Sequence, residues 1–343
     1  MRILIFNVNW RGDVLFSTPA IKAIRRRYRD AYIACVVVPR CREILSGNPG
    51  LDEVIIFDED GARRGPIGKL RFIIELRRKH LDQVFLFHRS FTRALLVWLA
   101  GIPERIGYCT KRRGPLLTTR VPTPNESLHR IEHFLGIVRA VGIEAETKLY
   151  EFHPSDQARR WASQFLADQG VADNDFLVVL NPGGNWGPKR WPVARYAELG
   201  EALRDTYNAK VLITGAAKDV VLADEIARLM KQRPISSCGK TTLEELGALL
   251  ERADLVISGD SGPMHIAVAV GTKVVALFGP TSHQITGPYG RGDYKVIWKD
   301  VGCKVPCYDL GCKDNRCMKA IAVDDVLEVL RVWARGDVKF LAG

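Results

Sequence analysis

The chain has 343 residues, 47% of them hydrophobic, which is typical of a globular protein with two domains and a sizeable core. The longest apolar run, 94–100, is too short to cross a bilayer, and no signal-peptide pattern opens the chain, so we expect a cytoplasmic protein. The net charge of +11 lies entirely in residues 1–150, which hold 26 Lys and Arg against 15 Asp and Glu, whereas residues 151–343 hold 24 of each.

In the N-terminal part, strand patterns alternate with helix patterns. We expect strands over 2–6, 34–38, 54–57, 83–87 and 106–108, and helices over 13–28, 69–79, 90–99 and 131–141. Residues 111–124 are expected to form an exposed basic loop. The alternation predicts a parallel sheet covered on both faces. Asp13 follows the first strand at the carboxyl edge of that sheet, where it is either a helix N-terminal charge or a general base.

A domain boundary is expected at residue 154, where the pattern restarts after a short linker. We expect an N-terminal domain over 1–153, a C-terminal domain over 154–322 and a final helical segment over 323–343. The second domain opens with a strand over 177–180 and the loop 181–192, which contains three glycines and Lys189. Such a loop is a plausible anion cradle, although it lacks the order of residues of a P-loop.

The stretch 258–265, Ser-Gly-Asp-Ser-Gly-Pro-Met-His, joins a predicted strand to a predicted helix. Gly259 and Gly262 let the backbone approach a ligand closely, and the helix start suits a phosphate. Asp260 can accept hydrogen bonds from hydroxyls. The alternative is an ordinary capped turn at the carboxyl edge of the sheet.

The eight cysteines fall into two sets. Cys35, Cys41, Cys109 and Cys238 are scattered and are expected to be reduced thiols. Cys303, Cys307, Cys312 and Cys317 are clustered. This cluster could bind zinc, but it contains no C-x2-C pair, so we favour a structural loop of reduced or locally bridged thiols and predict no metal.

Four motifs together resemble glycosyltransferase family 9, the ADP-heptose:lipopolysaccharide heptosyltransferases. They span 2–5 with 12–21, 189–192, 259–265 and 278–281, and the cysteine-rich segment ending at Met318 resembles the heptosyltransferase II-like branch. The resemblance implies an α/β fold of the GT-B type, with two Rossmann-like parallel-sheet domains facing across a cleft. It implies an acceptor site in the first domain, a nucleotide-sugar site in the second, and a final helix that returns to the first.

The reaction implied is inverting, metal-independent transfer of heptose from ADP-heptose to the inner core of lipopolysaccharide, without a cofactor. Asp13 matches the catalytic base of the family. The donor-binding positions match Gly184, Lys189, Asp219, Thr241, Asp260, Ser261, Gly262 and His265. Lys189 and the N–H groups at 261–264 would stabilise the departing diphosphate. Each assignment has a structural alternative: a helix-start charge for Asp13, a solvated side chain for Lys189, a cap for Asp260 and a packed histidine for His265.

The basic N-terminal part suits a phosphorylated lipid A–core acceptor and peripheral contact with the anionic inner leaflet of the inner membrane. Candidate acceptor-binding residues are Arg63, Arg64, Lys111, Arg112 and Arg113. Solvated helix faces are the alternative for these clusters. Nucleic acid is disfavoured as a partner because aromatic residues are not interleaved with the basic ones.

The motifs also bear on three other functions. A nicotinamide oxidoreductase should show G-x-G-x-x-G after a strand, and neither 9–13 nor 181–187 does. A non-catalytic sugar- or nucleotide-binding module could dispense with a base, yet Asp13 is present. A family 9-like transferase with another nucleotide sugar or acceptor stays open.

Overall fold

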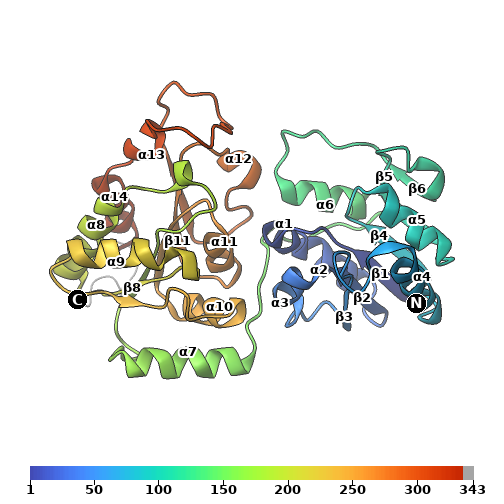
Figure 1. Ribbon diagram of the computed structural model, residues 1–343, viewed down its shortest axis with the longest axis horizontal. Helices are drawn as coiled ribbons and strands as arrows, with labels where there is room; N and C mark the ends of the chain where they lie inside the picture. The colour runs from blue at the N-terminus through green and yellow to red at the C-terminus, as the bar shows by residue number, and fades with distance from the viewer. Residues whose placement is uncertain (335–343) are drawn as a thin grey trace. The chain divides into compact units, whose positions relative to one another are not determined.

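The computed structural model describes residues 1–334, which form two compact units (Figure 1). Unit 1 comprises Met1–His153 with Tyr289–Arg291, and unit 2 comprises Pro154–Pro288 and the chain from Gly292 onward. The main segment of unit 1 thus ends at His153, the last residue of the expected N-terminal domain. Each unit is a six-stranded parallel sheet with helices on both faces, which confirms the predicted α/β class.

The sheet of unit 1 has the strand order β3-β2-β1-β4-β5-β6. Its strands are β1 (Arg2–Phe6), β2 (Tyr32–Val37), β3 (Glu53–Ile56), β4 (Gln83–Leu86), β5 (Glu104–Tyr108) and β6 (Thr119–Val121). Its helices are α1 (Arg11–Phe16), α2 (Thr18–Arg27), α3 (Arg42–Leu45), α4 (Gly65–Arg78), α5 (Phe91–Leu99) and α6 (Arg130–Arg139). The chain leaves β1 toward β2 and later returns to β4 on its other side, so the order reverses between β1 and β4. Ligands of such sheets bind outside the carboxyl ends of the strands at this switch point.

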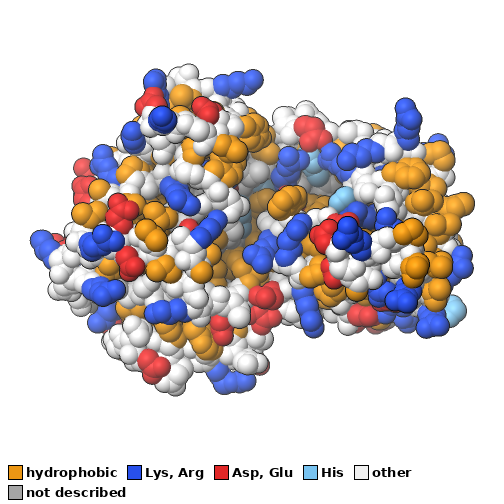
Figure 2. Space-filling model, viewed as in Figure 1, with side chains coloured by type: hydrophobic (Ala, Val, Ile, Leu, Met, Phe, Trp, Pro, Cys, Tyr) orange, Lys and Arg blue, Asp and Glu red, His pale blue; other side chains and the backbone are white. Residues whose placement is uncertain are grey.

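Helices α4 and α5 cover one face of this sheet. Their buried residues join Leu4 and Phe6 of β1 in one apolar cluster, which includes Phe72 and Val97. The rings of Phe6 and Phe72 meet edge to face with centroids 6.1 Å apart. Hydrophobic side chains also remain visible over α4 and α5 on the outer surface (Figure 2). These two helices are therefore apolar on more than the face that packs on the sheet.

Two features of unit 1 differ from the sequence-based expectation. The helix expected over 13–28 is two helices, because Pro19 lacks an N–H for the carbonyl of Leu15, and the Thr18 hydroxyl donates to that carbonyl instead at 2.8 Å. The loop expected over 111–124 contains β6, which pairs with β5. A strand of three residues with one buried side chain has almost no alternating signal, which explains why it was missed.

The sheet of unit 2 has the order β12-β11-β10-β7-β8-β9. Its strands are β7 (Leu177–Asn181), β8 (Lys210–Ile213), β9 (Ile235–Ser236), β10 (Leu255–Gly259), β11 (Lys273–Phe278) and β12 (Tyr294–Trp298). Its helices are α7 (Asp156–Asp168), α8 (Val193–Tyr207), α9 (Val220–Leu229), α10 (Leu243–Arg252), α11 (Gly262–Ala269), α12 (His283–Thr286), α13 (Arg316–Lys319) and α14 (Val323–Ala334). Here the order reverses between β7 and β10, so the predicted anion cradle and the 258–265 turn emerge side by side.

The final helix, α14, packs within unit 2. Val326 and Leu330 are fully buried in the cluster that also holds Trp191, and the helix lies against α8 and β12. The Trp191 indole N–H donates to the carbonyl of Ile321 at 2.9 Å, which ties the cradle loop to the start of this helix. The described part of the segment expected to return to the first domain therefore belongs to unit 2, and residues 335–343 lie outside the described residues.

A short segment from late in the chain belongs to unit 1. The ring of Tyr289 stacks on that of His129 at 4.1 Å, and its hydroxyl donates to Glu132 at 2.9 Å. Burial would raise the pKa of Glu132, but hydrogen bonds from Lys148, Arg139 and Tyr289 lower it to about 2. Nothing in the sequence predicted this placement, because the contacts join residues 157 to 160 positions apart.

Candidate active site

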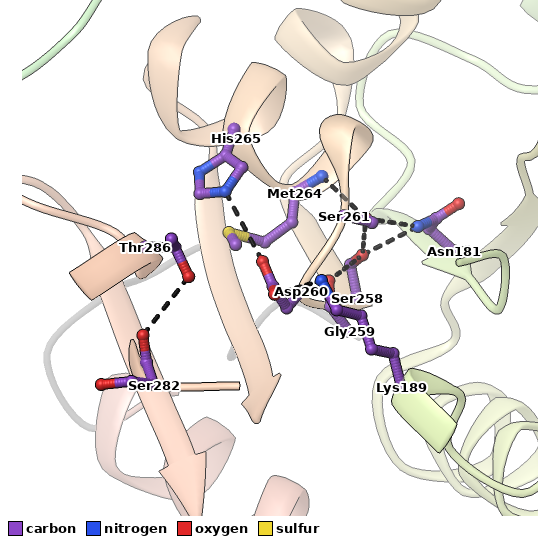
Figure 3. Close-up of polar contacts among 10 residues, drawn as sticks. All are labelled: Asn181, Lys189, Ser258, Gly259, Asp260, Ser261, Met264, His265, Ser282 and Thr286. Carbon is purple, nitrogen blue, oxygen red and sulfur yellow. Dashed lines mark hydrogen bonds and ion pairs between the residues drawn. The ribbon is translucent and has the colours of Figure 1, made fainter. Parts of the chain in front are cut away.

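The carboxyl edge of unit 2 is organised by Asn181, the last residue of β7. Its side-chain amide donates to the Ser258 hydroxyl at 2.8 Å and to the Ser261 hydroxyl at 2.9 Å, and the two hydroxyls lie 2.9 Å apart (Figure 3). The Tyr196 hydroxyl donates to the backbone carbonyl of Asn181 at 3.0 Å. The ends of the two switch-point strands are thus joined by buried hydrogen bonds, which hold the turn after β10 in one conformation.

Helix α11 begins at this turn. Ser261 is its N-cap and accepts a hydrogen bond from the N–H of Met264 at 3.4 Å. A Cβ on Gly262 would meet no atom within 4 Å, so the space beside the first turn is open. A Cβ on Gly259 would lie 3.0 Å from the Lys189 carbonyl oxygen. The missing side chain therefore lets the loop that carries Lys189 pack closely, and it makes no room for a ligand. An open helix start with its positive dipole end suits an anionic group.

Asp260 lies between Lys189 and His265. Its carboxylate accepts from Lys189 Nζ at 2.6 Å, and the other oxygen is 3.8 Å from His265 Nε2 (Figure 3). Burial would raise the pKa of Asp260, but the hydrogen bond from His265 and the charge of Lys189 lower it to about 2. Lys189 Nζ is also 4.5 Å from the centre of the Trp186 ring. Asp260 is therefore ionised and holds Lys189 in place at the start of α11.

A second carboxylate, Asp219, is buried where two glycine-containing turns meet. One of its oxygens accepts from the N–H of Ala216 at 3.0 Å, and the other has no hydrogen-bond partner within residues 1–334. A Cβ on Gly183 would lie 2.7 Å from its carboxylate, and one on Gly215 would lie 2.8 Å from its Cβ. The glycines therefore admit the Asp219 side chain. The oxygen without a hydrogen bond lies 3.9 Å from the Arg190 guanidinium and can accept a hydrogen bond from a hydroxyl.

Three buried hydroxyls at the same sheet edge were not among the predicted site residues, although Thr281 belongs to the 278–281 motif. Thr214 follows β8, Ser237 follows β9 and Thr281 lies three residues after β11. Each hydroxyl is buried and lacks a hydrogen-bond partner within the described chain. An unpaired buried polar group costs about 1–3 kcal/mol, so these hydroxyls are suited to a polar ligand. Their position at strand ends was the available signal.

The carboxyl edge of unit 1 carries Asp13 in the first turn of α1, directly after β1. Around it, Arg40 Nε donates to the Asn9 carbonyl at 2.9 Å, and the Arg40 guanidinium lies 5.0 Å from the centre of the exposed Trp10 ring. The Asn9 amide donates to Glu59 at 2.8 Å. Asp13 thus lies at the switch point, and the neighbouring loops are held by side-chain contacts.

On the β4 side of this edge, cations outnumber acids. Burial and three neighbouring cations lower the pKa of His88 to about 3, so this histidine is neutral. The cations are Arg93, Arg113 and Lys111. Arg93 pairs with Glu59 at 2.8 Å and is almost fully buried.

Arg89, which follows His88 in the sequence, pairs with Glu126 at 2.6 Å. A second nitrogen of its guanidinium lies 2.7 Å from His133 Nδ1. Arg89 and Arg93 were not among the predicted acceptor residues, although both follow a strand end.

Comparison with known proteins identifies the family. The model of "Glycosyltransferase family 9 (heptosyltransferase)" matches residues 69–315. The chain is 30% identical to lipopolysaccharide heptosyltransferase 2 of Escherichia coli K12 over 302 residues, which is 84% of this chain and 85% of the relative. The protein belongs to glycosyltransferase family 9. The enzyme is therefore a glycosyltransferase, as the sequence motifs predicted.

Solved structures agree on the fold of this transferase. A family 9 glycosyltransferase from Veillonella parvula has a TM-score of 0.87 at 23% identity and covers 100% of this chain and 98% of its own. The Escherichia coli ADP-heptose lps heptosyltransferase II has a TM-score of 0.78 at 26% identity and covers 97% and 98%. The two Rossmann-like units are those of the predicted GT-B class.

Most donor-binding residues predicted for the transferase lie at the carboxyl edge of unit 2. Lys189, Asp260, Ser261, Gly262 and His265 form one group, whereas Asp219 lies beside the Gly183 turn. The Gly184 carbonyl accepts from Arg190 at 3.0 Å. Thr241 is half-buried just before Thr242, the N-cap of α10. Their roles in donor binding stay predictions.

The acceptor-binding candidates of the transferase are scattered over different environments. Arg113 is fully buried and donates to the carbonyl of Tyr108 at 2.7 Å, so the expectation of an exposed loop is wrong at this residue. Arg63 pairs with Glu75 and lies over the Phe72 ring at 5.7 Å, which gives it a structural role. Arg64, Lys111 and Arg112 are exposed.

The four clustered cysteines of the transferase line one small cavity of about 50 Å³ in unit 2. All eight cysteines are free thiols, and residues 1–334 contain no group of three or more His, Cys, Asp or Glu arranged to hold a metal ion. The N–H of Cys307 donates to the Pro280 carbonyl at 2.7 Å, and a Cβ on Gly279 would lie 3.0 Å from Cys317 Sγ. This segment therefore supports the turn that carries Thr281.

Proposed function

We propose that this transferase moves heptose from ADP-heptose to the inner core of lipopolysaccharide, with inversion at the anomeric carbon and without a metal ion. The observation that carries the donor half is the group formed by Lys189, Asp260 and the start of α11 at the switch point of unit 2. The motifs of this group match the family, and curated relatives across 84% of the chain are lipopolysaccharide heptosyltransferases.

The donor diphosphate binds Lys189 Nζ and the first turn of α11. Both carry positive charge, and the hydrogen bond to Asp260 orients the ammonium before the ligand arrives. As the bond between the anomeric carbon and the diphosphate oxygen breaks, the electron pair leaves with ADP. Its charge develops next to these groups, which stabilise the transition state more than the bound donor.

Asp13 acts as the general base. The acceptor hydroxyl oxygen forms a bond to the anomeric carbon opposite the leaving diphosphate, which inverts that centre, and the hydroxyl proton passes to a carboxylate oxygen of Asp13. The start of α1 favours the ionised carboxylate that this step requires.

The acceptor binds at the carboxyl edge of unit 1. The cations near His88 suit the phosphate or carboxylate groups of a lipid A–core acceptor, and Arg89 presents a planar guanidinium there. An acceptor that is anchored in a bilayer also implies peripheral contact of the enzyme with the anionic cytoplasmic leaflet of the inner membrane.

The test is a transfer assay with a heptose-deficient lipopolysaccharide acceptor, ADP-heptose and a panel of other nucleotide sugars, each with and without EDTA. We expect transfer from ADP-heptose alone, unchanged by EDTA, and an anomeric configuration in the product opposite to that of the donor. Transfer from another nucleotide sugar would show that the proposed donor is wrong. Loss of activity in EDTA would exclude the metal-free mechanism, and a product that retains the donor's anomeric configuration would exclude single displacement.

A further inference from the structure

Helix α4 is apolar on two faces. Gly68, Phe72, Ile73 and Leu76 are buried against the sheet, but Ile67, Leu70 and Ile74 are 69%, 57% and 40% exposed. The exposed residues follow the spacing i, i+3, i+7, so they form a stripe along one side of the helix. A surface helix normally buries its single apolar stripe, and the second stripe of α4 remains in solvent.

The neighbouring helix α5 has the same property. Ala94, Leu96 and Val97 are buried, whereas Phe91, Trp98 and Leu99 are 43%, 47% and 37% exposed. The ends of the two helices are joined, because the Arg77 guanidinium donates to the Leu99 carbonyl at 2.8 Å. The two exposed stripes therefore lie on adjacent helices, where hydrophobic and basic side chains gather (Figures 1 and 2).

The same surface is strongly basic. Residues 63–79 contain seven Lys and Arg but only one acid, Glu75, which pairs with Arg63. Arg71 and Arg78 are exposed and lie four and eleven residues after Ile67, so they are on the same side of the helix as the apolar stripe. Apolar side chains bordered by unneutralised cations are the pattern of proteins that lie on an anionic bilayer.

We propose that α4 and α5 form the surface by which this enzyme docks on an anionic phospholipid leaflet. This α4–α5 surface consists of Ile67, Leu70, Ile74, Phe91, Trp98 and Leu99, with Arg71, Arg77 and Arg78. The apolar residues enter the headgroup region, where tryptophan is favoured, and the arginines bind lipid phosphates. None of the helices within residues 1–334 qualifies as a membrane-spanning segment.

Charge argues for lipid over a second copy of the chain. Two copies meeting through the α4–α5 surface would bring like charges together, whereas an anionic leaflet supplies the opposite sign. Phe91, the first residue of α5, follows Arg89 by two residues, so the surface begins at the sheet edge proposed to bind the acceptor. Docking would hold that edge close to the bilayer, an inference that rests on the proposed lipid-anchored acceptor.

The first experiment measures sedimentation of the full chain with vesicles of phosphatidylcholine alone and of equal parts phosphatidylcholine and phosphatidylglycerol. We expect binding to the anionic vesicles that weakens with salt. The double variant Arg71→Gln/Arg78→Gln should bind about tenfold to thirtyfold more weakly, because each basic residue near an anionic surface strengthens binding and two are removed. Leu70→Gln/Trp98→Gln should also weaken binding.

Matched controls come from exposed residues of unit 2. Arg228→Gln/Lys231→Gln removes the same charge, and Val221→Gln/Leu229→Gln removes apolar side chains that are 68% and 55% exposed on α9. Both should bind anionic vesicles like the unmodified protein. Equal weakening by the controls, no binding to anionic vesicles, or a dimer in light scattering that Trp98→Gln abolishes would overturn the proposal.

The second experiment separates docking from the transferase activity. With an acceptor embedded in anionic vesicles, Arg71→Gln/Arg78→Gln should lower the transfer rate about tenfold, whereas with a deacylated, water-soluble acceptor it should leave the rate unchanged. Loss with both acceptors would overturn a docking role. If the unmodified protein transfers no heptose to either acceptor, the proposed function fails, and vesicle binding still tests the surface.

Discussion

In unit 2 the charged groups at the carboxyl edge of the sheet are paired and tied to the backbone, whereas in unit 1 the same edge carries more cations than acids. Lys189, Asp260 and His265 form a closed group next to a capped helix. Near the switch point of unit 1, two arginines and a lysine surround a neutral histidine. Both units have the same strand topology, so the difference lies in the side chains that each sheet edge carries.

The difference matches the two proposed ligands. A diphosphate whose charge grows during the reaction is best served by groups already oriented, which need no reorganisation. An acceptor with several anionic groups gains from an excess of cations, which also attract it over a distance. The predictions that follow test this division, from the largest expected effect to the smallest.

The largest effect is expected at Asp13. Asp13→Asn should lower kcat by about 10²–10⁴, because the proton of the attacking hydroxyl loses its acceptor, while ADP-heptose binding stays unchanged. Asp30→Asn, an exposed carboxylate between α2 and β2 at the opposite edge of the sheet, is the control and should retain full activity. Steady-state kinetics and calorimetric titration measure the two quantities. An Asp13→Asn enzyme with normal kcat would remove Asp13 from the reaction.

Lys189 should affect the donor alone. Lys189→Ala should weaken binding of ADP-heptose about 10- to 100-fold, as expected for the loss of a charge-assisted hydrogen bond, without changing the acceptor KM. Lys231→Ala removes an exposed lysine of the same unit and should bind the donor normally. Calorimetric titration measures the affinity of each variant for ADP-heptose. Equal affinity of Lys189→Ala and the unmodified enzyme would contradict the proposed diphosphate site.

Arg89 should have the complementary effect. Arg89→Gln should raise the acceptor KM about tenfold, with donor affinity unchanged, because a planar cation is removed from the edge of unit 1. Arg130→Gln is a matched control, since Arg130 pairs with the same Glu126 at 3.3 Å but lies in α6. If both variants raise KM equally, the effect belongs to Glu126 and the guanidinium of Arg89 has no direct part in acceptor binding.

His88 provides the smallest effect, on stability. Its pKa is about 3 in the folded protein and 6.5 in its ordinary state, so between these values the unfolded chain binds the additional proton and stability falls as pH falls. At pH 5 the loss should be about 1–2 kcal/mol relative to pH 7.5. Urea unfolding should show this loss in the unmodified protein and a smaller one in His88→Asn. Identical pH profiles would mean that folding does not change the pKa of His88.

Local sequence patterns determined the class of the fold and the places where its sites lie. Apolar runs that end in glycine and polar residues predicted the central strands, and their alternation with helices predicted parallel sheets. Because parallel strands share one carboxyl edge, the positions of Asp13, Lys189 and Asp260 after three such strands already pointed to ligand-binding edges. Three of the four edge strands, β6, β9 and β12, were not predicted, because a strand that pairs on one side needs little apolar pattern, whereas the fourth, β3, was predicted over 54–57.

Tertiary structure alone decided which of these residues meet. Lys189 and Asp260 are 71 residues apart, and only the pairing of β7 beside β10 brings them to 2.6 Å. The same holds for Asn181, whose amide joins two turns, and for Tyr289, which packs in unit 1. Arg113 looks like a surface charge in sequence, yet it is buried, and backbone carbonyls accept hydrogen bonds from its guanidinium. Long-range hydrogen bonds and burial depend on how the strands are ordered, and local sequence patterns carry no record of that order.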